Sequence, residues 1–170
     1  MWKKIKKLIA KWLHQPTRRK AFEGFALSEN YLIFRTDQEQ QRAISERLIE
    51  KLQADDKQYI VLNYSRKGAE ALNEARSFRY SGKETDRLGK PRSDKLREII
   101  GQSYDVFIDL HSGDDLHCHY LRRAVKTALV VRVADEDYAE SDIHLPAKAS
   151  ADEIAKTLIK YLGVITKHSA

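Results

Sequence analysis

The stretch Tyr104-Asp-Val-Phe-Ile-Asp-Leu110 is the clearest strand in the sequence, because apolar and β-prone residues run through it with little interruption. A helical pattern follows from about Asp115 to Lys126, and a second apolar run comes next, Ala128-Leu-Val-Val-Arg-Val133. A strand, a helix and a strand in this order predict two parallel strands joined by a helical crossover.

The same order recurs upstream of this unit. Tyr31-Leu-Ile-Phe34 is a β-prone run, and Thr36-Asp-Gln-Glu39 has the pattern of a capping box for a helix that reaches about Ala54. A second predicted strand, Tyr59-Ile-Val-Leu-Asn-Tyr64, precedes a helix expected over about residues 67–75. Strands and helices therefore alternate along the first half of the chain.

Two more helices carry recognisable start signals. Ser93 is expected to cap a helix that reaches Ile100. Ser150-Ala-Asp-Glu153 is a second capping box, and the helix behind it is expected to stop at Gly163.

This alternation, in a chain of 170 residues, predicts one α/β domain over residues 21–170. We expect a three-layer, open, mainly parallel sheet of five to six strands, Rossmann-like or flavodoxin-like. The sixth strand would be Phe78–Tyr80 or Ile143–Leu145. A basic amphipathic helix, residues 1–20, is expected to precede the domain.

The composition indicates in which cellular compartment the protein is expected. Cys118 is the one cysteine, so the chain has no disulfide partner within itself. No apolar stretch approaches the roughly 18 residues that a spanning helix needs. We therefore expect a cytoplasmic protein, found at the inner face of the cytoplasmic membrane if its N-terminal arm binds lipid.

The first 20 residues, here called the arm, carry eight of the 31 basic residues and none of the 25 acidic ones. On a helical wheel its apolar residues occupy one side and its lysines the other. The segregation is typical of a helix on an anionic membrane surface, and RNA, a protein partner or the protein's own core are the alternatives. The residues predicted to bind an anionic surface are Trp2, Lys3, Lys4, Lys6, Lys7, Lys11, Trp12, Arg18, Arg19 and Lys20.

A second basic region lies between residues 76 and 97 and includes an exposed loop expected over residues 82–92. It supports the alternative that the protein binds RNA or the ribosome, with Phe78 and Tyr80 as stacking faces. The patch consists of Arg76, Arg79, Lys83, Arg87, Lys90 and Arg92.

A ligand pocket is expected where two strands end, because open parallel sheets bind ligands beyond the carboxyl ends of their strands. No glycine-rich phosphate loop is present, which counts against nucleotide hydrolysis, and we predict no cofactor. Asp109 and His111 are weak candidates for acid–base chemistry, so no catalytic residue is assigned and an enzyme is not expected. The predicted pocket residues are Thr36, Asp37, Asp109, His111, Ser112 and Asp114.

Histidines and the cysteine cluster between residues 111 and 119. On a helix His117 and His119 lie about 200° apart and cannot share one ion, so we expect no metal and interpret Cys118 as a buried packing residue. A site formed by His111 with His117 or Cys118, together with Asp114, is the alternative.

Four sequence segments carry a family resemblance: YLIFRTDQEQQ from Tyr31, RLGKP at 87–91, YDVFIDL at 104–110 and the terminal YLGVI from Tyr161. With the basic N-terminal helix, this order resembles a family of small uncharacterised bacterial α/β proteins without an established activity. YLIFRTD at 31–37 and YDVFIDLHS at 104–112 are also similar to the N-terminal half of heptosyltransferase-like glycosyltransferases.

The function predicted from these features is a non-enzymatic α/β adaptor or binding domain. It would dock through its arm to an anionic surface, with membrane headgroups slightly favoured. The alternatives are an RNA- or ribosome-associated protein and a small glycosyltransferase-like ligand-binding domain.

Overall fold

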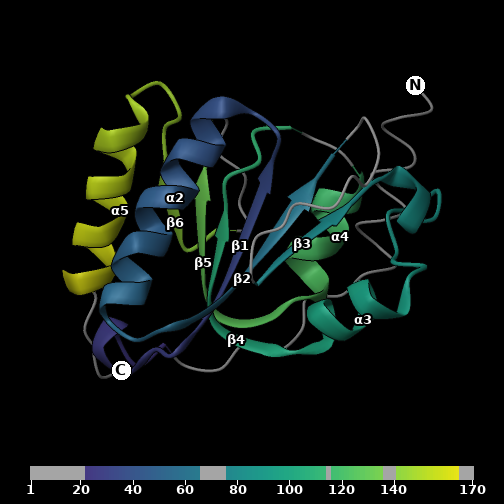
Figure 1. Cartoon of the computed structure of the whole chain (residues 1–170), viewed down its shortest axis with the longest axis horizontal. Coiled ribbons are helices and arrows are strands. Elements are labelled where there is room, and N and C mark those ends of the chain that lie inside the picture. Colours follow the sequence, from purple (N-terminus) through teal and green to yellow (C-terminus); the bar gives the residue numbers. More distant parts are fainter. Residues whose placement is uncertain (1–21, 66–75, 114–115, 136–140, 165–170) are drawn as a thin grey trace.

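The structure is a computed structural model that describes residues 22–65, 76–113, 116–135 and 141–164 (Figure 1). The arm, the helix expected over residues 67–75, and Asp114 lie outside the described residues. The strands are β1 Asn30–Thr36, β2 Gln58–Tyr64, β3 Ser77–Tyr80, β4 Ser103–Asp109, β5 Lys126–Val133 and β6 Ile143–Leu145. The helices are α2 Glu39–Ala54, α3 Asp94–Gly101, α4 Leu116–Ala124 and α5 Ala151–Val164, with 3₁₀ turns η1 Phe25–Leu27 and η2 Gly82–Glu84.

The six strands form one sheet in the order β3-β2-β1-β4-β5-β6, and every pair is parallel. This order is that of the Rossmann fold, so the predicted α/β class is confirmed and the flavodoxin-like order is excluded. Both segments proposed as a sixth strand belong to the sheet, as β3 and β6.

Helices cover both faces of the sheet (Figure 1). On one face α2 and α5 pack on Ile33, Val106 and Val131. On the other, α3 and α4 pack on Phe34 and Phe107. Because the central strands are buried on both faces, their sequences are almost continuously apolar, which makes them recognisable. No helix in the described part of the chain is long and apolar enough to span a bilayer.

Two of the three helix caps predicted from the sequence are confirmed, and one is wrong. Ser93 caps α3 by accepting from the Leu96 N–H, and Ser150 forms the expected reciprocal bonds with Glu153. The box expected at Thr36 is wrong: α2 begins at Glu39, and the amide and hydroxyl of Thr36 donate instead to Oε1 of Gln41, at 2.7 and 2.9 Å. The longer Gln41 side chain reaches back to Thr36 and replaces the predicted pairing.

The loop expected to be exposed between residues 82 and 92 is partly packed against α4. Asp86 accepts from the amides of Leu88 and Lys90, which closes the turn. Gly89 has φ 85°, and a Cβ there would lie 2.6 Å from the Cα of His117. The loop therefore supports the first turn of α4, and only glycine permits this approach.

Candidate functional site

A pocket of about 620 Å³ lies where the chain leaves β1 and β4 on opposite faces of the sheet. The two strands are neighbours, with Phe34 paired to Asp109, yet β1 leads into α2 and β4 leads toward α4. Such a reversal of strand order opens a crevice at the carboxyl ends of the strands. The lining residues are Arg35, Thr36, Asp37, Gln38, Arg42, Asn63, Tyr64, Arg79, His111, Ser112 and Gly113.

Three arginines and one carboxylate set the charge of this pocket. Arg79 binds Asp37 at 2.6 Å, so these two charges compensate each other. Arg35 is only 2% exposed and donates to the Ser45 hydroxyl at 2.6 Å. Arg42 is exposed and forms an ion pair with Glu46 at 3.3 Å on the same helix. The lining therefore contains three guanidinium groups and one carboxylate.

Asp37 stays ionised at the mouth of the pocket. Burial opposes the charge of Asp37, but hydrogen bonds from Ser65, Arg79 and Asn63 outweigh it and hold the pKa of this carboxyl below its usual range. Asn63 donates to Asp37 at 3.1 Å, and Arg79 approaches from the neighbouring strand β3. The carboxylate thus fixes two side chains of the pocket wall, and the Arg79 guanidinium beside it offsets its negative charge.

The amino-terminal end of α2 adds a partial positive charge at the same place. Thr36, Asp37 and Gln38 line the pocket immediately before the helix begins, and the side chain of the N-cap residue Gln38 does not cap it. The first amides of a helix and its dipole both favour an anion at that end. The arginines and the helix end therefore act in the same direction.

Asp109 lies beneath the pocket and does not line it. Its side chain is fully buried, accepts from Nε of Arg122 at 2.6 Å, and lies 3.9 Å from Nε of Arg132. Its other oxygen accepts the backbone N–H of His111 at 3.0 Å. Asp109 consequently holds the turn after β4 and two buried arginines, rather than facing a ligand.

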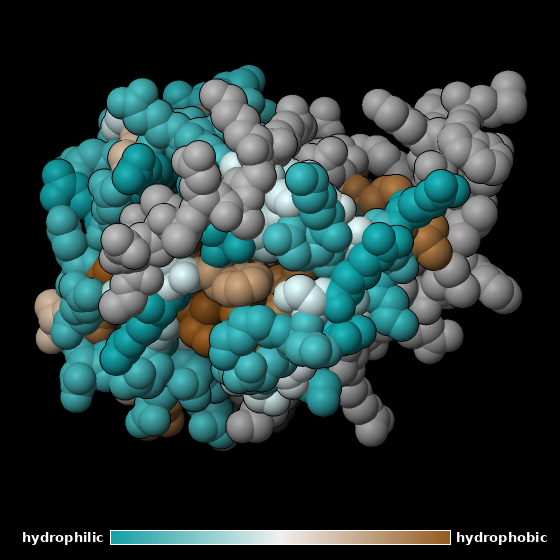
Figure 2. All heavy atoms as spheres, turned by 45° about the vertical axis from the view of Figure 1, so that its right-hand side comes forward, coloured by the Kyte–Doolittle hydropathy of each residue, from teal (hydrophilic) through white to brown (hydrophobic). Residues whose placement is uncertain are grey.

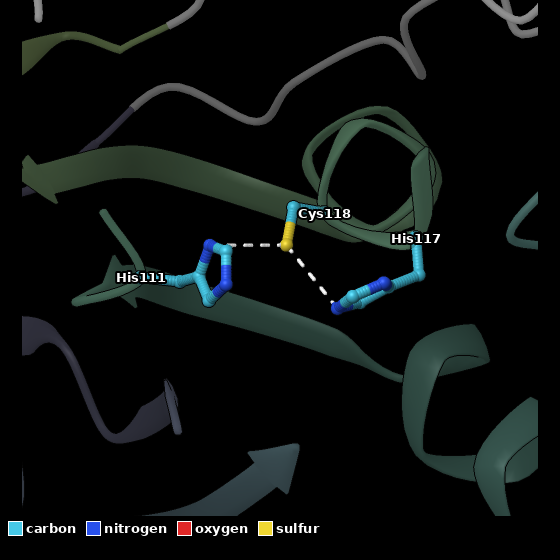
Figure 3. A group of neighbouring side chains, drawn as sticks. All are labelled: His111, His117 and Cys118. Carbon is cyan, nitrogen blue, oxygen red and sulfur yellow. Dashed lines mark hydrogen bonds between the residues drawn. The ribbon is translucent and has the colours of Figure 1, made fainter. Parts of the chain in front are cut away.

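Figure 3 shows Cys118 between the rings of His111 and His117. Its Sγ lies 3.2 Å from Nδ1 of His111 and 3.3 Å from Nε2 of His117. All three side chains are buried, and their potential ligand atoms lie within 4.8 Å of one another. The ring of His117 also packs on Tyr64, with 3.9 Å between centroids. These are the described residues that could hold a metal ion.

One comparison with known proteins assigns a family. The profile of a family of unknown function, DUF6913, matches residues 2–165. The chain belongs to the DUF6913 family. No curated protein and no solved structure matches it.

The structure brings together four of the six pocket residues predicted for this DUF6913 chain. Thr36, Asp37, His111 and Ser112 line one pocket, whereas Asp109 is buried below it. Asp114 lies outside the described residues.

The predicted basic patch of the DUF6913 chain is divided. Arg76 lies over the ring of Tyr59 at the amino ends of the strands, whereas Arg79 enters the pocket at their carboxyl ends. Tyr80 is fully buried, so it offers no stacking face to RNA, contrary to expectation. The remaining exposed members are Lys83, Arg87, Lys90 and Arg92.

Sequence reasoning missed Arg35, Arg42, Asn63 and Tyr64 as pocket residues. Arg35 and Asn63 could have been found, because each is a polar residue near the carboxyl end of an otherwise apolar, buried strand. Arg79 was assigned to the basic patch because its place depends on β3 joining the sheet. Arg42 had no local signal, since it is one of several charged residues on α2.

Proposed function

We propose that the protein is a binding domain for a small anionic ligand, held at the carboxyl edge of the sheet. The observation that carries the proposal is the pocket at the reversal of strand order, whose lining contains Arg35, Arg42 and Arg79 against one carboxylate. Its volume of about 620 Å³ falls within the range of ordinary small-molecule sites, about 300–1,000 Å³.

Arginine side chains favour phosphate or carboxylate as the anionic group. A guanidinium binds either group with two parallel hydrogen bonds, and a buried one such as Arg35 is held in place before the ligand arrives. The sequence has no glycine-rich loop to bind a pyrophosphate through backbone amides. Side chains and the start of α2 would therefore provide the anion contacts.

The resemblance of YLIFRTD and YDVFIDLHS to the N-terminal half of heptosyltransferase-like proteins supports a small ligand-binding domain. A nucleoside diphosphate sugar is included among the probes because its two phosphates are anionic groups that arginine binds. Binding, not catalysis, is proposed, since Asp109 is engaged with Arg122 below the pocket.

Calorimetric titration with inorganic phosphate, pyrophosphate and a nucleoside diphosphate sugar tests this proposal. Arg42→Ala should weaken binding about 10-fold or more, because a charge-assisted hydrogen bond contributes about 1.5–3 kcal/mol. Arg47→Ala is the matched control: Arg47 lies on the same helix, is similarly exposed and pairs with Glu50, with a longer contact of 3.8 Å to Asp152 of α5. The proposal would be contradicted if none of the three probes bound with a Kd below about 1 mM. It would also be contradicted if Arg42→Ala and Arg47→Ala lost the same amount of affinity.

The arm supports a second candidate function, docking to an anionic membrane surface. Its support is the complete separation of Trp2, Ile5, Leu8, Ile9, Trp12 and Leu13 from the lysines on a helical wheel. Trp2→Ala with Trp12→Ala should abolish binding to anionic liposomes although every lysine is kept. RNA binding would instead follow the number of lysines and fall steeply with salt.

For the RNA alternative, the exposed residues Lys83, Arg87, Lys90 and Arg92 offer phosphate contacts. The described residues on the face in Figure 2 are mainly hydrophilic, with hydrophobic residues near the centre and in smaller groups toward the edges. Lys83→Gln with Lys90→Gln should lower RNA affinity and its salt dependence if this loop contacts phosphates. Lys156→Gln is the control, because this exposed lysine lies on α5, outside the basic region.

A further inference from the structure

We propose that His111, His117 and Cys118 form a binding site for Zn²⁺. The proposal goes beyond the anion pocket and does not depend on it. It departs from the expectation that the chain binds no metal. That expectation rested on the separation of His117 and His119, and the structure does not place His119 in the cluster. The proposal takes up the alternative in which His111 combines with residues of α4.

The distances between the ligand atoms are close to those around one ion. Tetrahedral Zn²⁺ binds thiolate sulfur at about 2.3 Å and imidazole nitrogen at about 2.0–2.1 Å, which places the sulfur about 3.5–3.6 Å from each nitrogen and the nitrogens about 3.3–3.4 Å apart. The Cys118 sulfur lies 3.2 and 3.3 Å from the two histidine nitrogens, and all three ligand atoms lie within 4.8 Å of one another. The three side chains therefore converge on one place, and shifts of the side chains would complete the geometry.

Hydrogen bonding between these groups is a poor substitute for a metal. A thiol has one proton and is a weak donor and a weak acceptor, so Cys118 can donate to only one of the two ring nitrogens. The cluster is deeply buried, with Cys118 at 0%, His111 at 4% and His117 at 7% exposure. A bound cation would be held by the thiolate and both imidazoles at once.

A buried hydroxyl beside the cluster is a second, independent observation. Tyr80 is fully buried, and its hydroxyl has no hydrogen-bond partner in the described part of the chain. It packs in the same core as Cys118, and its ring contacts that of His117 edge-on, with 6.2 Å between centroids. A water molecule on the ion would offer such a hydroxyl a partner.

The ligand types select the metal. One thiolate and two imidazoles suit Zn²⁺ and exclude Mg²⁺ and Ca²⁺, which prefer oxygen ligands. Three protein ligands in the described part of the chain leave one position of a tetrahedral ion for water or a ligand, and His111 also lines the pocket. Nδ1 of His111 now accepts a hydrogen bond from the Gly113 N–H at 2.9 Å. The ion would replace this hydrogen bond by binding the same lone pair.

Elemental analysis and Co²⁺ titration of the full chain test the proposal. We expect one Zn²⁺ per chain, and a near-ultraviolet sulfur-to-cobalt charge-transfer band with Co²⁺, because only a ligating thiolate produces that band. Cys118→Ser should remove the band and weaken Zn²⁺ binding at least roughly 100-fold, since even changes to groups that only orient a ligand cost about 10–100-fold. His117→Gln should also release Zn²⁺, whereas His119→Gln, two residues away, should keep both the ion and the band.

A melting experiment covers the case in which a variant folds poorly. Metal-free wild type and His119→Gln should gain melting temperature when Zn²⁺ is restored, and Cys118→Ser should not. The proposal would be overturned if the wild-type protein melted cooperatively but showed no cobalt band. It would also be overturned if Cys118→Ser retained as much Zn²⁺ as the wild type. Arg42→Ala should keep its full zinc content, so loss of anion binding and loss of metal binding are separable.

Discussion

The two faces of the sheet are built from different residues. Beneath α2 and α5 the core is almost entirely aliphatic, with Leu48 and Leu158 among its fully buried members. Beneath α3 and α4 the core contains aromatic rings and Cys118, and Asp109 binds Arg122 there. The face under α2 also buries Arg35, which donates to the Ser45 hydroxyl. What distinguishes the other face is its buried carboxylate–guanidinium pair and its cysteine–histidine cluster, both close to the pocket.

The largest expected effect comes from the buried charges. Asp109→Asn should lower the free energy of unfolding by about 3–5 kcal/mol, because it removes the carboxylate beside the buried guanidinium groups of Arg122 and Arg132. Urea unfolding monitored by circular dichroism measures this loss. Adding Arg122→Met should recover part of it by removing one of the two buried positive charges. A loss below about 1 kcal/mol, the range of surface pairs, would show that the ion pair is not buried as described.

Two matched leucines test whether the faces differ in function as well as composition. Leu158→Ala on α5 and Leu121→Ala on α4 each empty a fully buried position and should cost about 2–5 kcal/mol. Only Leu121→Ala should also weaken Zn²⁺ binding, since Leu121 lies one helical turn after Cys118. Equal zinc affinity in both variants, measured well below their melting temperatures, would remove the functional distinction between the faces.

The sequence was sufficient for the layered fold but only partly sufficient for the site. Continuous apolar runs such as Val106–Ile108 identify strands buried on both faces, and strand–helix alternation makes them parallel. The pocket depends on strand order, which no local pattern contains: Arg79 reaches Asp37 only because β3 lies beside β2. The cluster of His111, His117 and Cys118 was only an alternative at the sequence level, because helical spacing relates residues within α4, whereas His111 comes from the turn after β4.

Helix caps should contribute equally on the two faces, which gives a baseline for the comparison. Ser93 caps α3 on one face, and Ser150 caps α5 on the other. Each serine-to-alanine change should cost about 1 kcal/mol, because it removes one acceptor for an N-terminal amide. Denaturant midpoints of the two variants should therefore shift by similar amounts. A much larger loss for Ser93→Ala would mean that α3 is less well supported by its core than α5.

The smallest effect is expected at the mouth of the pocket, and it depends on pH. Hydrogen bonds from Ser65, Arg79 and Asn63 outweigh the effect of burial and lower the pKa of Asp37 in the folded protein. A carboxyl with a lowered folded pKa stabilises the protein above its unfolded value of about 3.9, and that contribution is lost as the pH falls through the folded value.

Asp37→Asn should therefore be less stable than wild type near pH 7, and the difference should shrink as the pH falls below about 4. The Asp37 side chain is 39% exposed, so solvent screening keeps this effect below that of the buried Asp109. Urea midpoints of both proteins between about pH 3 and pH 7 measure it. A difference that is constant across this range would mean that Asp37 does not ionise differently on folding. The Arg79 contact would then position the pocket wall without stabilising the charge of Asp37.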